Sequence, residues 1–403
     1  MPTRFGAGFS EKADSWQAGV EAAAAAMAEA DTDRCDLAIM YSTSKHDPRQ
    51  LRDGLRSVVG SRSRLIGGYS CGAIMRDKLG YEGFQVGVAL MASDSIQVDM
   101  FIETGIAGNE RRAGVAMGRQ IGGASYAGEP NLLLMYDCIK ERVPRGFSVN
   151  RATPLIEGIS DSLSEWPRAA GVGMIGDLQG NPTYQWFDDR IEQHSAMALV
   201  LSGGVRMDTI IMHGCKPAST YHQITRAEGA TVLEIDGRPA VDVIGELIGP
   251  ELADGWQETP FFLTLGVNKG DKFGPFREVD YANRMCMAVD RERGGLIMFE
   301  DDLKTGHDIQ LMRRSIDSEH VAVRSRELLA RVQERRPVFA LYIDCAVRAS
   351  AYCGTEKEEA EEVQKLVGPL MPLLGMYSGV EIAKVGASMQ ALDYTAVLCL
   401  FSE

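Results

Sequence analysis

The sequence repeats one local order three times: a short apolar run, a helical segment and a second apolar run. Apolar runs of this length, bounded by polar residues, are typical of buried strands. The alternation predicts an α/β protein, with α+β as the alternative, in which helices cover layered sheets. The three expected strand–helix–strand units are residues 36–41, 50–59 and 64–68; residues 131–136, 154–163 and 168–175; and residues 338–343, 356–367 and 373–377.

Two pairs of short motifs indicate that these units are duplicated. Residues 65–74 match residues 373–382 in Leu, Gly, Tyr, Ser and Ile at the same offsets. Residues 135–138 resemble residues 342–345, because both segments end in Asp-Cys. Chance similarity of Gly-rich turns is the alternative, but agreement of two independent motifs in order favours an internal repeat.

The length of the chain, 403 residues, predicts two or three domains. A strand expected at residues 208–212 leads into turns and short strands that do not follow the repeated order. We therefore place a boundary near residues 205–230. One α/β domain is expected over residues 1–215 and a second over residues 216–403.

Composition excludes several classes of protein. The formal net charge is −14, so a surface that binds nucleic acid is disfavoured. No apolar run reaches the roughly 18 residues of a membrane span, and the first residues lack the apolar core of a signal peptide. The eight cysteines are scattered without a Cys-x-x-Cys pair, which argues against a zinc site. These features predict a cytoplasmic protein with free thiols and with neither nucleic acid nor membrane as a partner.

Residues 68–72 read Gly-Tyr-Ser-Cys-Gly, which is the pattern of the nucleophile turn in α/β-hydrolases. A predicted strand precedes it, but no helical stripe follows and no His-Gly-Gly loop precedes it. The copy around Ser378 lacks the second half of the pattern. A structural turn, or ligand contacts from Ser70, Cys71 and Ser378, is therefore favoured over catalysis.

Two Asp-Cys pairs end predicted strands, at Asp137-Cys138 and at Asp344-Cys345. Ligands of open α/β sheets bind outside such strand ends. Arg348 follows closely enough to bind a ligand carboxylate or to lower the pKa of a nearby thiol. The alternative is that each Asp caps a turn and each Cys is a small buried side chain. Because the pair recurs, we count all five residues as candidates for ligand binding.

His213 ends a predicted strand before Gly214, which would allow close approach of a ligand. A neutral imidazole can ligate haem iron, so His213 is a candidate haem ligand. The more ordinary interpretation is a hydrogen-bonded histidine in a turn. The six histidines show no paired spacing typical of a metal site.

Three further patterns carry less information. No P-loop motif is present. Residues 171–176 match Gly-x-Gly-x-x-Gly, but they lie within a predicted strand, so dinucleotide binding is disfavoured. The charged run at residues 356–362 is predicted to be a solvated helix face.

Several motifs in order resemble the FIST family, whose name refers to F-box and intracellular signal transduction proteins. The N-terminal part is similar to a FIST N domain and the later part to a FIST C domain. The N-terminal motifs are residues 8–10, 36–41 and 67–72; the later motifs are residues 214–217, 225–229, 233–237, 344–345 and 375–382.

The resemblance implies a stand-alone sensory protein that binds a small ligand, such as an amino acid or a related metabolite. It also implies a separate signalling partner, such as a histidine kinase or a cyclic-di-GMP enzyme. One subgroup of the family binds haem and senses nitric oxide, which makes a haem sensor with His213 as the iron ligand the first alternative. The second is an enzyme, either a serine hydrolase at Ser70 or an acyl transferase at Cys345.

Overall fold

Three six-stranded sheets form the body of the protein, and each has the same strand order. The computed structural model describes residues 2–143, 146–249, 255–258, 262–315 and 318–403. Each sheet is built around one of three larger units of the chain, residues 4–92, 96–203 and 206–402, each of which contains one of the expected strand–helix–strand segments. Four strands of the unit lie side by side, in the order first, fourth, second and third along the chain. A hairpin from another unit completes the sheet. The second and third strands of each unit are parallel, and a helix connects them.

The strand bounds follow this common order. The first sheet contains β1 (Arg4–Ser10), β6 (Val86–Ala92), β2 (Leu37–Ser42), β3 (Arg64–Tyr69), β12 (Gln185–Phe187) and β13 (Arg190–Glu192). The second contains β7 (Ile96–Thr104), β14 (Ser195–Gly203), β8 (Asn131–Asp137), β11 (Arg168–Met174), β26 (Val380–Val385) and β27 (Ser388–Leu392). The third contains β15 (Arg206–Met212), β28 (Ala396–Ser402), β24 (Pro337–Cys345), β25 (Leu373–Ser378), β4 (Gly72–Met75) and β5 (Leu79–Tyr81).

The hairpins are exchanged around the three units in a cycle. The hairpin β4–β5 leaves the first unit and pairs with β25 of the third. The hairpin β12–β13 leaves the second unit and pairs with β3 of the first, and β26–β27 leaves the third and pairs with β11 of the second. Each unit therefore completes the sheet of another, and the three sheets form a closed ring.

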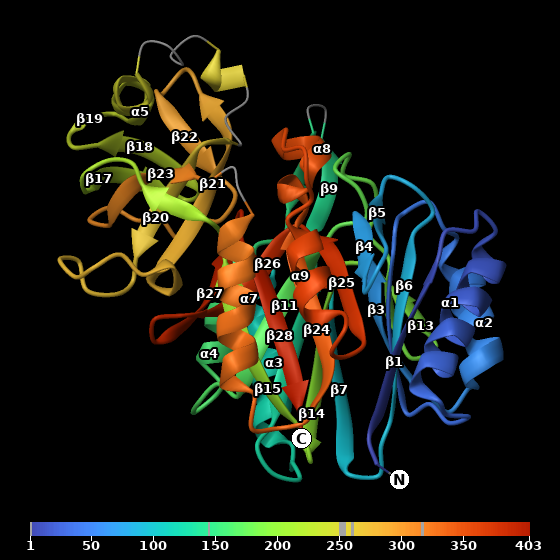
Figure 1. Ribbon diagram of the computed structural model, residues 1–403. Helices are drawn as coiled ribbons and strands as arrows, with labels where there is room; N and C mark the ends of the chain where they lie inside the picture. Colours follow the sequence, from blue (N-terminus) through green and yellow to red (C-terminus); the bar gives the residue numbers. More distant parts are fainter. Residues whose placement is uncertain (1, 144–145, 250–254, 259–261, 316–317) are drawn as a thin grey trace.

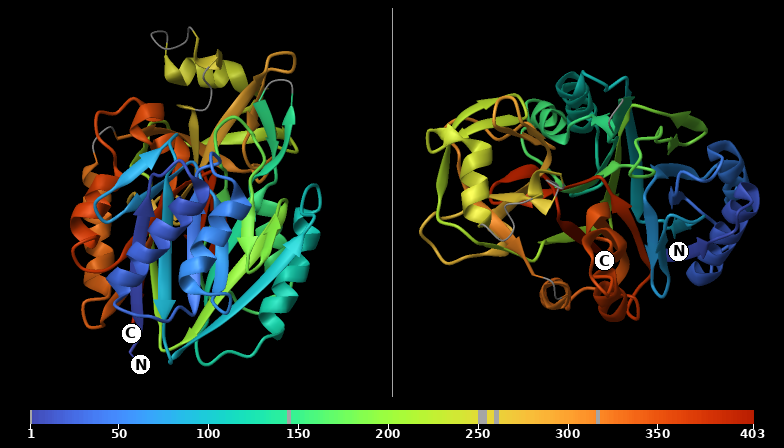
Figure 2. Two further views of the ribbon diagram at one scale, coloured as in Figure 1. Left: turned by 90° about the vertical axis from the view of Figure 1, so that its right-hand side faces the viewer. Right: turned by 90° about the horizontal axis from the view of Figure 1, so that it is seen from above.

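Helices cover the outer faces of the sheets, and the inner faces meet in one shared core (Figure 2). Ile39, Met135 and Ile343, one from each sheet, all belong to that inner core. Each outer face forms a separate core with its two helices. These helices are α1 (Ser15–Ala30) and α2 (Pro48–Val59), α3 (Glu110–Gly123) and α4 (Ala152–Ser160), and α7 (Glu319–Arg331) and α9 (Ala360–Val367).

The first helix shows how local sequence sets this packing. Asp14 caps α1 by accepting a hydrogen bond from Gln17 N at 2.8 Å, as expected for an N-cap. The alanine-rich helix lies directly on β1, where a Cβ atom at Gly8 would be 2.0 Å from the carbonyl oxygen of Ala22. The glycine is therefore required by close approach of backbones rather than by its own conformation.

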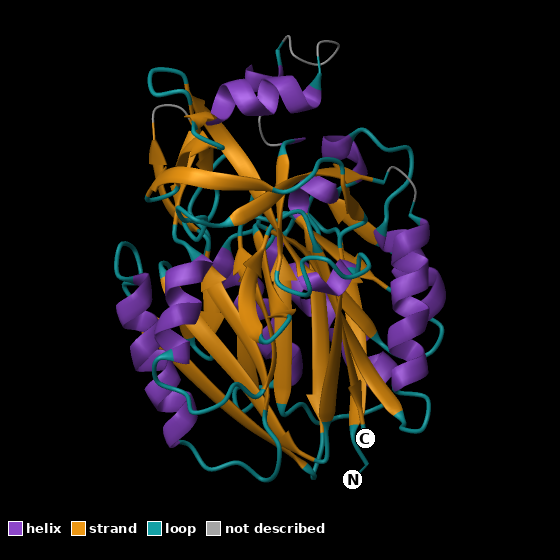
Figure 3. Cartoon of the chain, turned by 90° about the vertical axis from the view of Figure 1, so that its left-hand side faces the viewer, coloured by secondary structure: helices purple, strands orange, loops and turns teal. Residues whose placement is uncertain are grey.

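A separate β domain is inserted between β15 and α7. Its core includes Ile224, Val243 and Leu265. Figure 1 shows this inserted domain at the upper left, beside β27 and α7, and Figure 3 shows it at the upper end of the molecule. Its elements are β16 (Cys215–Pro217), β17 (His222–Glu228), β18 (Thr231–Ile235), β19 (Arg238–Pro239), α5 (Ala240–Ile248), β20 (Thr264–Asn268), β21 (Tyr281–Asp290), β22 (Gly295–Met298) and β23 (Asp308–Arg314).

The remaining elements are short. They are the hairpin of β9 (Ile139–Val143) and β10 (Gly146–Val149), the helix α8 (Ser350–Cys353), and the 3-10 helices η1 (Trp256–Glu258), η3 (Glu278–Asp280) and η4 (Ala346–Arg348). Within the described ranges, no helix has the length and apolar character needed to cross a bilayer.

The predicted α/β class and layered sheets are confirmed, and the three expected units are β2-α2-β3, β8-α4-β11 and β24-α9-β25. The sequence did not predict β1, β7 or α3. The division expected between residues 215 and 216 falls where the chain leaves β15 and enters the inserted domain. Because the chain later returns to the third sheet, residues 216–403 contain two structural parts.

Candidate functional site

The carboxyl ends of the parallel strands meet at one end of the body. Cys71 N donates a hydrogen bond to Tyr377 O at 3.1 Å, and Gly379 N donates to Gly173 O at 2.9 Å. These bonds join the ends of β3, β25 and β11. Strand ends of this kind are where α/β sheets bind ligands, and the predicted site residues all lie in or near this region.

Strand alternation divides the predicted residues between two faces. In β24, Ile343 lies in the inner core and Tyr342 in the core beneath α7 and α9. Side chains alternate along a strand, so Asp344 faces the helices and Cys345 faces the interior. The same argument sorts the other predicted site residues by the face of the sheet on which their side chains lie. The interior set, whose side chains face the shared core, consists of Ser70, Asp137, Cys345 and Ser378. The outer set, whose side chains face the helices, consists of Cys71, Cys138, Asp344 and, from η4, Arg348.

The two Asp-Cys pairs are one residue out of register. Asp344 lies opposite Tyr377 of β25, whereas Asp137 lies opposite Met174 of β11. The residue equivalent to Tyr377 is Gly173, since both carbonyls accept the hydrogen bond from the neighbouring unit. A shift of one residue turns a side chain to the other face of a strand. The two pairs are therefore not structurally equivalent, although both read Asp-Cys.

Arg348 is the centre of a buried ionic network on the outer face. Its guanidinium donates to Asp344 Oδ1 at 2.8 Å, to a Glu359 carboxylate oxygen, and to the carbonyl oxygens of His213 and Tyr394 at 3.3 Å each. Burial raises the pKa of Asp344 to about 6, although Arg348 opposes this shift. Because all three nitrogens of Arg348 are engaged, a ligand carboxylate would have to displace a protein group to pair with it.

Glu359 belongs to this network, although in the sequence it is only one residue of the charged run 356–362. It also pairs with Arg314, whose Nη2 lies 2.7 Å from Glu359 Oε1. Glu358 is 8% exposed and Glu359 is 3% exposed. The interpretation of the charged run as a solvated face is therefore wrong for these two residues, because both side chains are buried against partners outside the run.

The interior set forms a polar layer above the shared core. Ser378 Oγ lies 2.5 Å from Glu381 Oε1 and 2.9 Å from Asp344 O, within hydrogen-bond distance of both oxygens. Asp137 accepts hydrogen bonds from the backbone of Ile139 at 2.9 Å and of His194 at 2.8 Å. Burial raises the pKa of Asp137 to about 7. These groups are satisfied by the protein itself.

The groups proposed for catalysis are not activated in this arrangement. Ser70 is fully buried and donates its proton to Gly72 O at 2.8 Å, rather than to a basic side chain. Burial raises the pKa of the Cys71, Cys138 and Cys345 thiols above the usual range. Since the thiolate is the reactive species, these cysteines are poor nucleophiles.

His213 uses both of its ring nitrogens within the protein. Nε2 lies 3.1 Å from Glu278 O, and Nδ1 accepts a hydrogen bond from Cys215 N at 2.9 Å. Burial lowers the pKa of His213 to about 4. A haem iron could bind His213 only after one of these bonds breaks. Among the described residues, no group of three or more His, Cys, Asp or Glu side chains is arranged to hold a metal ion.

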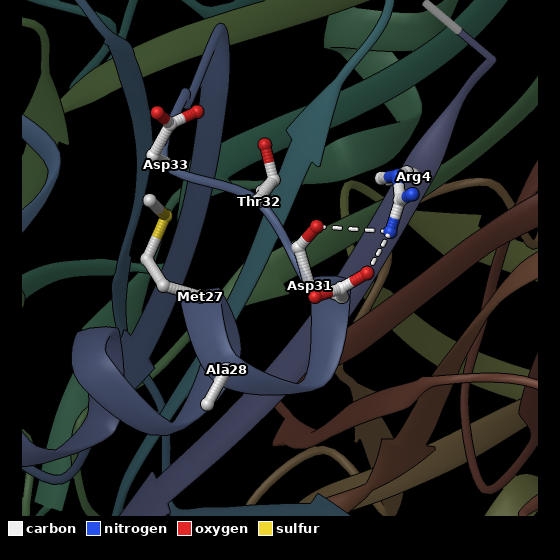
Figure 4. A pocket seen from close by; sticks show the side chains of 6 residues that line it. All are labelled: Arg4, Met27, Ala28, Asp31, Thr32 and Asp33. Carbon is white, nitrogen blue, oxygen red and sulfur yellow. Dashed lines mark hydrogen bonds and ion pairs between the residues drawn. The ribbon is translucent and has the colours of Figure 1, made fainter.

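A surface pocket of about 490 Å³ lies at the opposite end of the body, where α1 ends (Figure 4). Its cation, Arg4, donates to the side chain of Asp31 at 2.7 Å and to the backbone oxygen of Asp31 at 2.9 Å. The Arg4 guanidinium is therefore already paired with Asp31, and the pocket lies away from the predicted residues.

Similarity to known proteins was found by sequence and by structure. Two uncharacterized proteins of Mycobacterium tuberculosis are 25% and 24% identical over 248 residues, which is 61% of this chain. The aligned region spans 64% and 63% of these relatives, just under two thirds of their length. A cyanuric acid hydrolase from A. caulinodans overlaps 50% of this chain and 71% of its own, at 9% identity and a TM-score of 0.25.

Family models cover most of the chain. The FIST N domain matches residues 36–238, and the FIST C domain matches residues 240–384. Both matches follow in the order expected from the sequence motifs, so this chain belongs to the FIST family.

Proposed function

We propose that this protein is a sensor that binds a small ligand, an amino acid or a related metabolite, and signals through a separate partner. FIST domains are sensory domains that bind small ligands, and FIST N and FIST C together cover residues 36–384. That coverage is the observation that carries the proposal. A histidine kinase or a cyclic-di-GMP enzyme is the proposed partner.

The geometry supports a coupling between ligand and conformation. The ionic network around Arg348 connects the third unit to His213 and Arg314, the two positions where the chain enters and leaves the inserted domain. A ligand that contacts both parts would favour one arrangement of them over another, provided that its affinity for the two differs. The changed surface would then report to the partner.

Two further features fit the proposal. All eight cysteines are free thiols, which supports a reducing, cytoplasmic location. The common strand order of the three sheets supports an internal repeat of the strand–helix–strand unit.

A thermal-shift screen of amino acids and organic acids tests the function. A ligand of the native state raises the melting temperature in a saturable way. The variants Asp344→Asn and Asp137→Asn each remove one carboxylate, from the outer and the interior set respectively. If the ligand contacts the outer network, only Asp344→Asn reduces the shift. Absence of any saturable shift across the screen would contradict the proposal.

A further inference from the structure

Asn283 of β21 is completely buried, yet its amide lacks a strong hydrogen-bond partner among the described residues. Within the described part of the chain, neither Oδ1 nor Nδ2 has a hydrogen-bond partner, and the side chain is 0% exposed. The Asn283 amide does interact with the thiol of Cys215, but a thiol is only a weak hydrogen-bond partner. Buried amides are almost always bonded, so this side chain points to a missing partner.

The inserted domain presents Asn283 on the face that meets the body. Tyr281 lies two residues earlier on the same strand face and packs with Cys215 and Met312. Cys215 lies directly opposite Arg314 in the β16–β23 pair, so those two side chains share a face. Asn283, Cys215 and Arg314 therefore belong to one surface of the inserted domain.

The body contacts this surface of the inserted domain through residues 393 and 394. Asp393 N lies 3.4 Å from Asn283 O, and Asp393 Oδ2 accepts a hydrogen bond from Met285 N at 2.9 Å. The Arg314 guanidinium lies over the Tyr394 ring, 5.0 Å from its centroid. Residues 393 and 394 lie in the connection between β27 and β28, so the contact joins the inserted domain to the body where the second and third sheets meet.

Further unused groups lie at the same junction. Among the described residues, Asp393 Oδ1 and Arg314 Nε also lack hydrogen-bond partners. Asp393 is 1% exposed. The unused set thus contains donors, on Arg314 and the Asn283 amide nitrogen, and acceptors, on Asp393 and the Asn283 amide oxygen.

The geometry points to a ligand site at this junction, lined by Asn283, Arg314 and Asp393, for a small molecule that carries both a carboxylate and an amino group. This inference rests on the proposed function and gives it a location. Arg314 Nε and Asn283 Nδ2 would donate to the carboxylate, and Asp393 Oδ1 and Asn283 Oδ1 would accept from the amino group. Such a ligand would bridge the inserted domain and the body.

Two buried asparagines provide a matched test. Asn131 is 1% exposed and fully bonded: Nδ2 donates to Leu201 O and Val205 O, both at 3.0 Å, and Oδ1 accepts from Met207 N at 2.7 Å. Replacing a bonded amide by Leu leaves its partners unsatisfied, whereas replacing an unused amide does not. We therefore compare Asn283→Leu with Asn131→Leu in the full chain.

The probes are the protein amino acids, added one at a time, with acetate and methylamine as fragments that each lack one of the two groups. In the wild type, at least one amino acid raises the melting temperature and both fragments do not. Asn283→Leu keeps the melting temperature of the free protein but weakens binding by about tenfold or more. Asn131→Leu lowers the melting temperature of the free protein but keeps the ligand-dependent shift.

The outcomes separate the two proposals. An amino-acid shift that persists in Asn283→Leu overturns the junction site but leaves the sensor function standing. No shift in the wild type overturns both. If Asn283→Leu lowers the melting temperature of the free protein as much as Asn131→Leu does, the amide has only a structural role. Should Asn283→Leu fail to fold, Asp393→Asn replaces it, and an unchanged amino-acid affinity in that variant also overturns the site.

Discussion

Arg348 Nε lies 2.8 Å from Asp344 Oδ1, and the two side chains are 0% and 2% exposed. The pair therefore has no access to water and depends on the rest of its network for compensation. Removing one partner of a buried pair leaves an uncompensated charge.

The variant Arg348→Met should lower the free energy of unfolding by about 3–5 kcal/mol, because Asp344 and Glu359 would both lose their main cation. Urea denaturation measures this change. The control is Arg226→Met, which breaks an ion pair with Glu228 whose side chains are 57% and 49% exposed; its effect should be a small fraction of that of Arg348→Met. Equal effects of the two variants would mean that the network contributes little.

Asp137 should make the protein less stable as pH rises. Burial raises its pKa to about 7 in the folded state, above the ordinary value of 3.8. Between these values the folded state binds more protons than the unfolded state, so the contribution is fully present below about pH 4 and is lost as pH rises through about 7. The variant Asp137→Asn should flatten the fall in stability between about pH 4 and 7, by an amount on the order of 4 kcal/mol. Parallel pH profiles of the two proteins would argue against a protonated Asp137.

Thiol labelling tests the enzyme alternative. Burial raises the pKa of Cys138 and Cys345 well above the usual range, so iodoacetamide should leave both unmodified in the native protein. Cys353 is partly exposed and should react first. Peptide mass spectrometry after a short pulse identifies the labelled residue. Fast, selective modification of Cys345 would favour an acyl transferase instead.

Gly8 should not tolerate a side chain. The Cβ atom of Gly8→Ala would lie 2.0 Å from Ala22 O, so α1 would have to move away from β1. The free energy of unfolding should fall by about 3 kcal/mol or more, at or beyond the usual range for overpacking. Gly123→Ala is the control, because no atom lies within 4 Å of the added Cβ; it should change stability by less than about 1 kcal/mol. A mild effect at Gly8 would mean that helix and strand can separate easily.

The sequence was sufficient for the elements that carry a strong local pattern. The apolar runs at residues 131–136 and 338–343 predicted β8 and β24. By contrast, β1 alternates glycine with larger residues, and its glycines make sense only beneath α1. For β7 a signal was present but not used, since apolar and polar residues alternate through most of Ile96–Thr104.

Side-chain partners were harder to predict than elements. Glu359 lies in a charged run, and only the fold brings Arg314 and Arg348 to it. The two Asp-Cys pairs have the same residue types, but the strand register determines on which face of its sheet each side chain lies. Asn283 has no distinguishing sequence context at all. Its importance comes from burial without a partner, which only the structure reveals.

Hydrogen exchange of the full chain, with and without a saturating amino acid found by the thermal-shift screen, tests the central claim most directly. A ligand that bridges the inserted domain and the body should slow amide exchange at residues 281–285 and 391–395, where the two parts meet. It should also change exchange in the segments that connect them. An identical exchange pattern with and without the ligand would contradict the account of this protein as a conformational sensor.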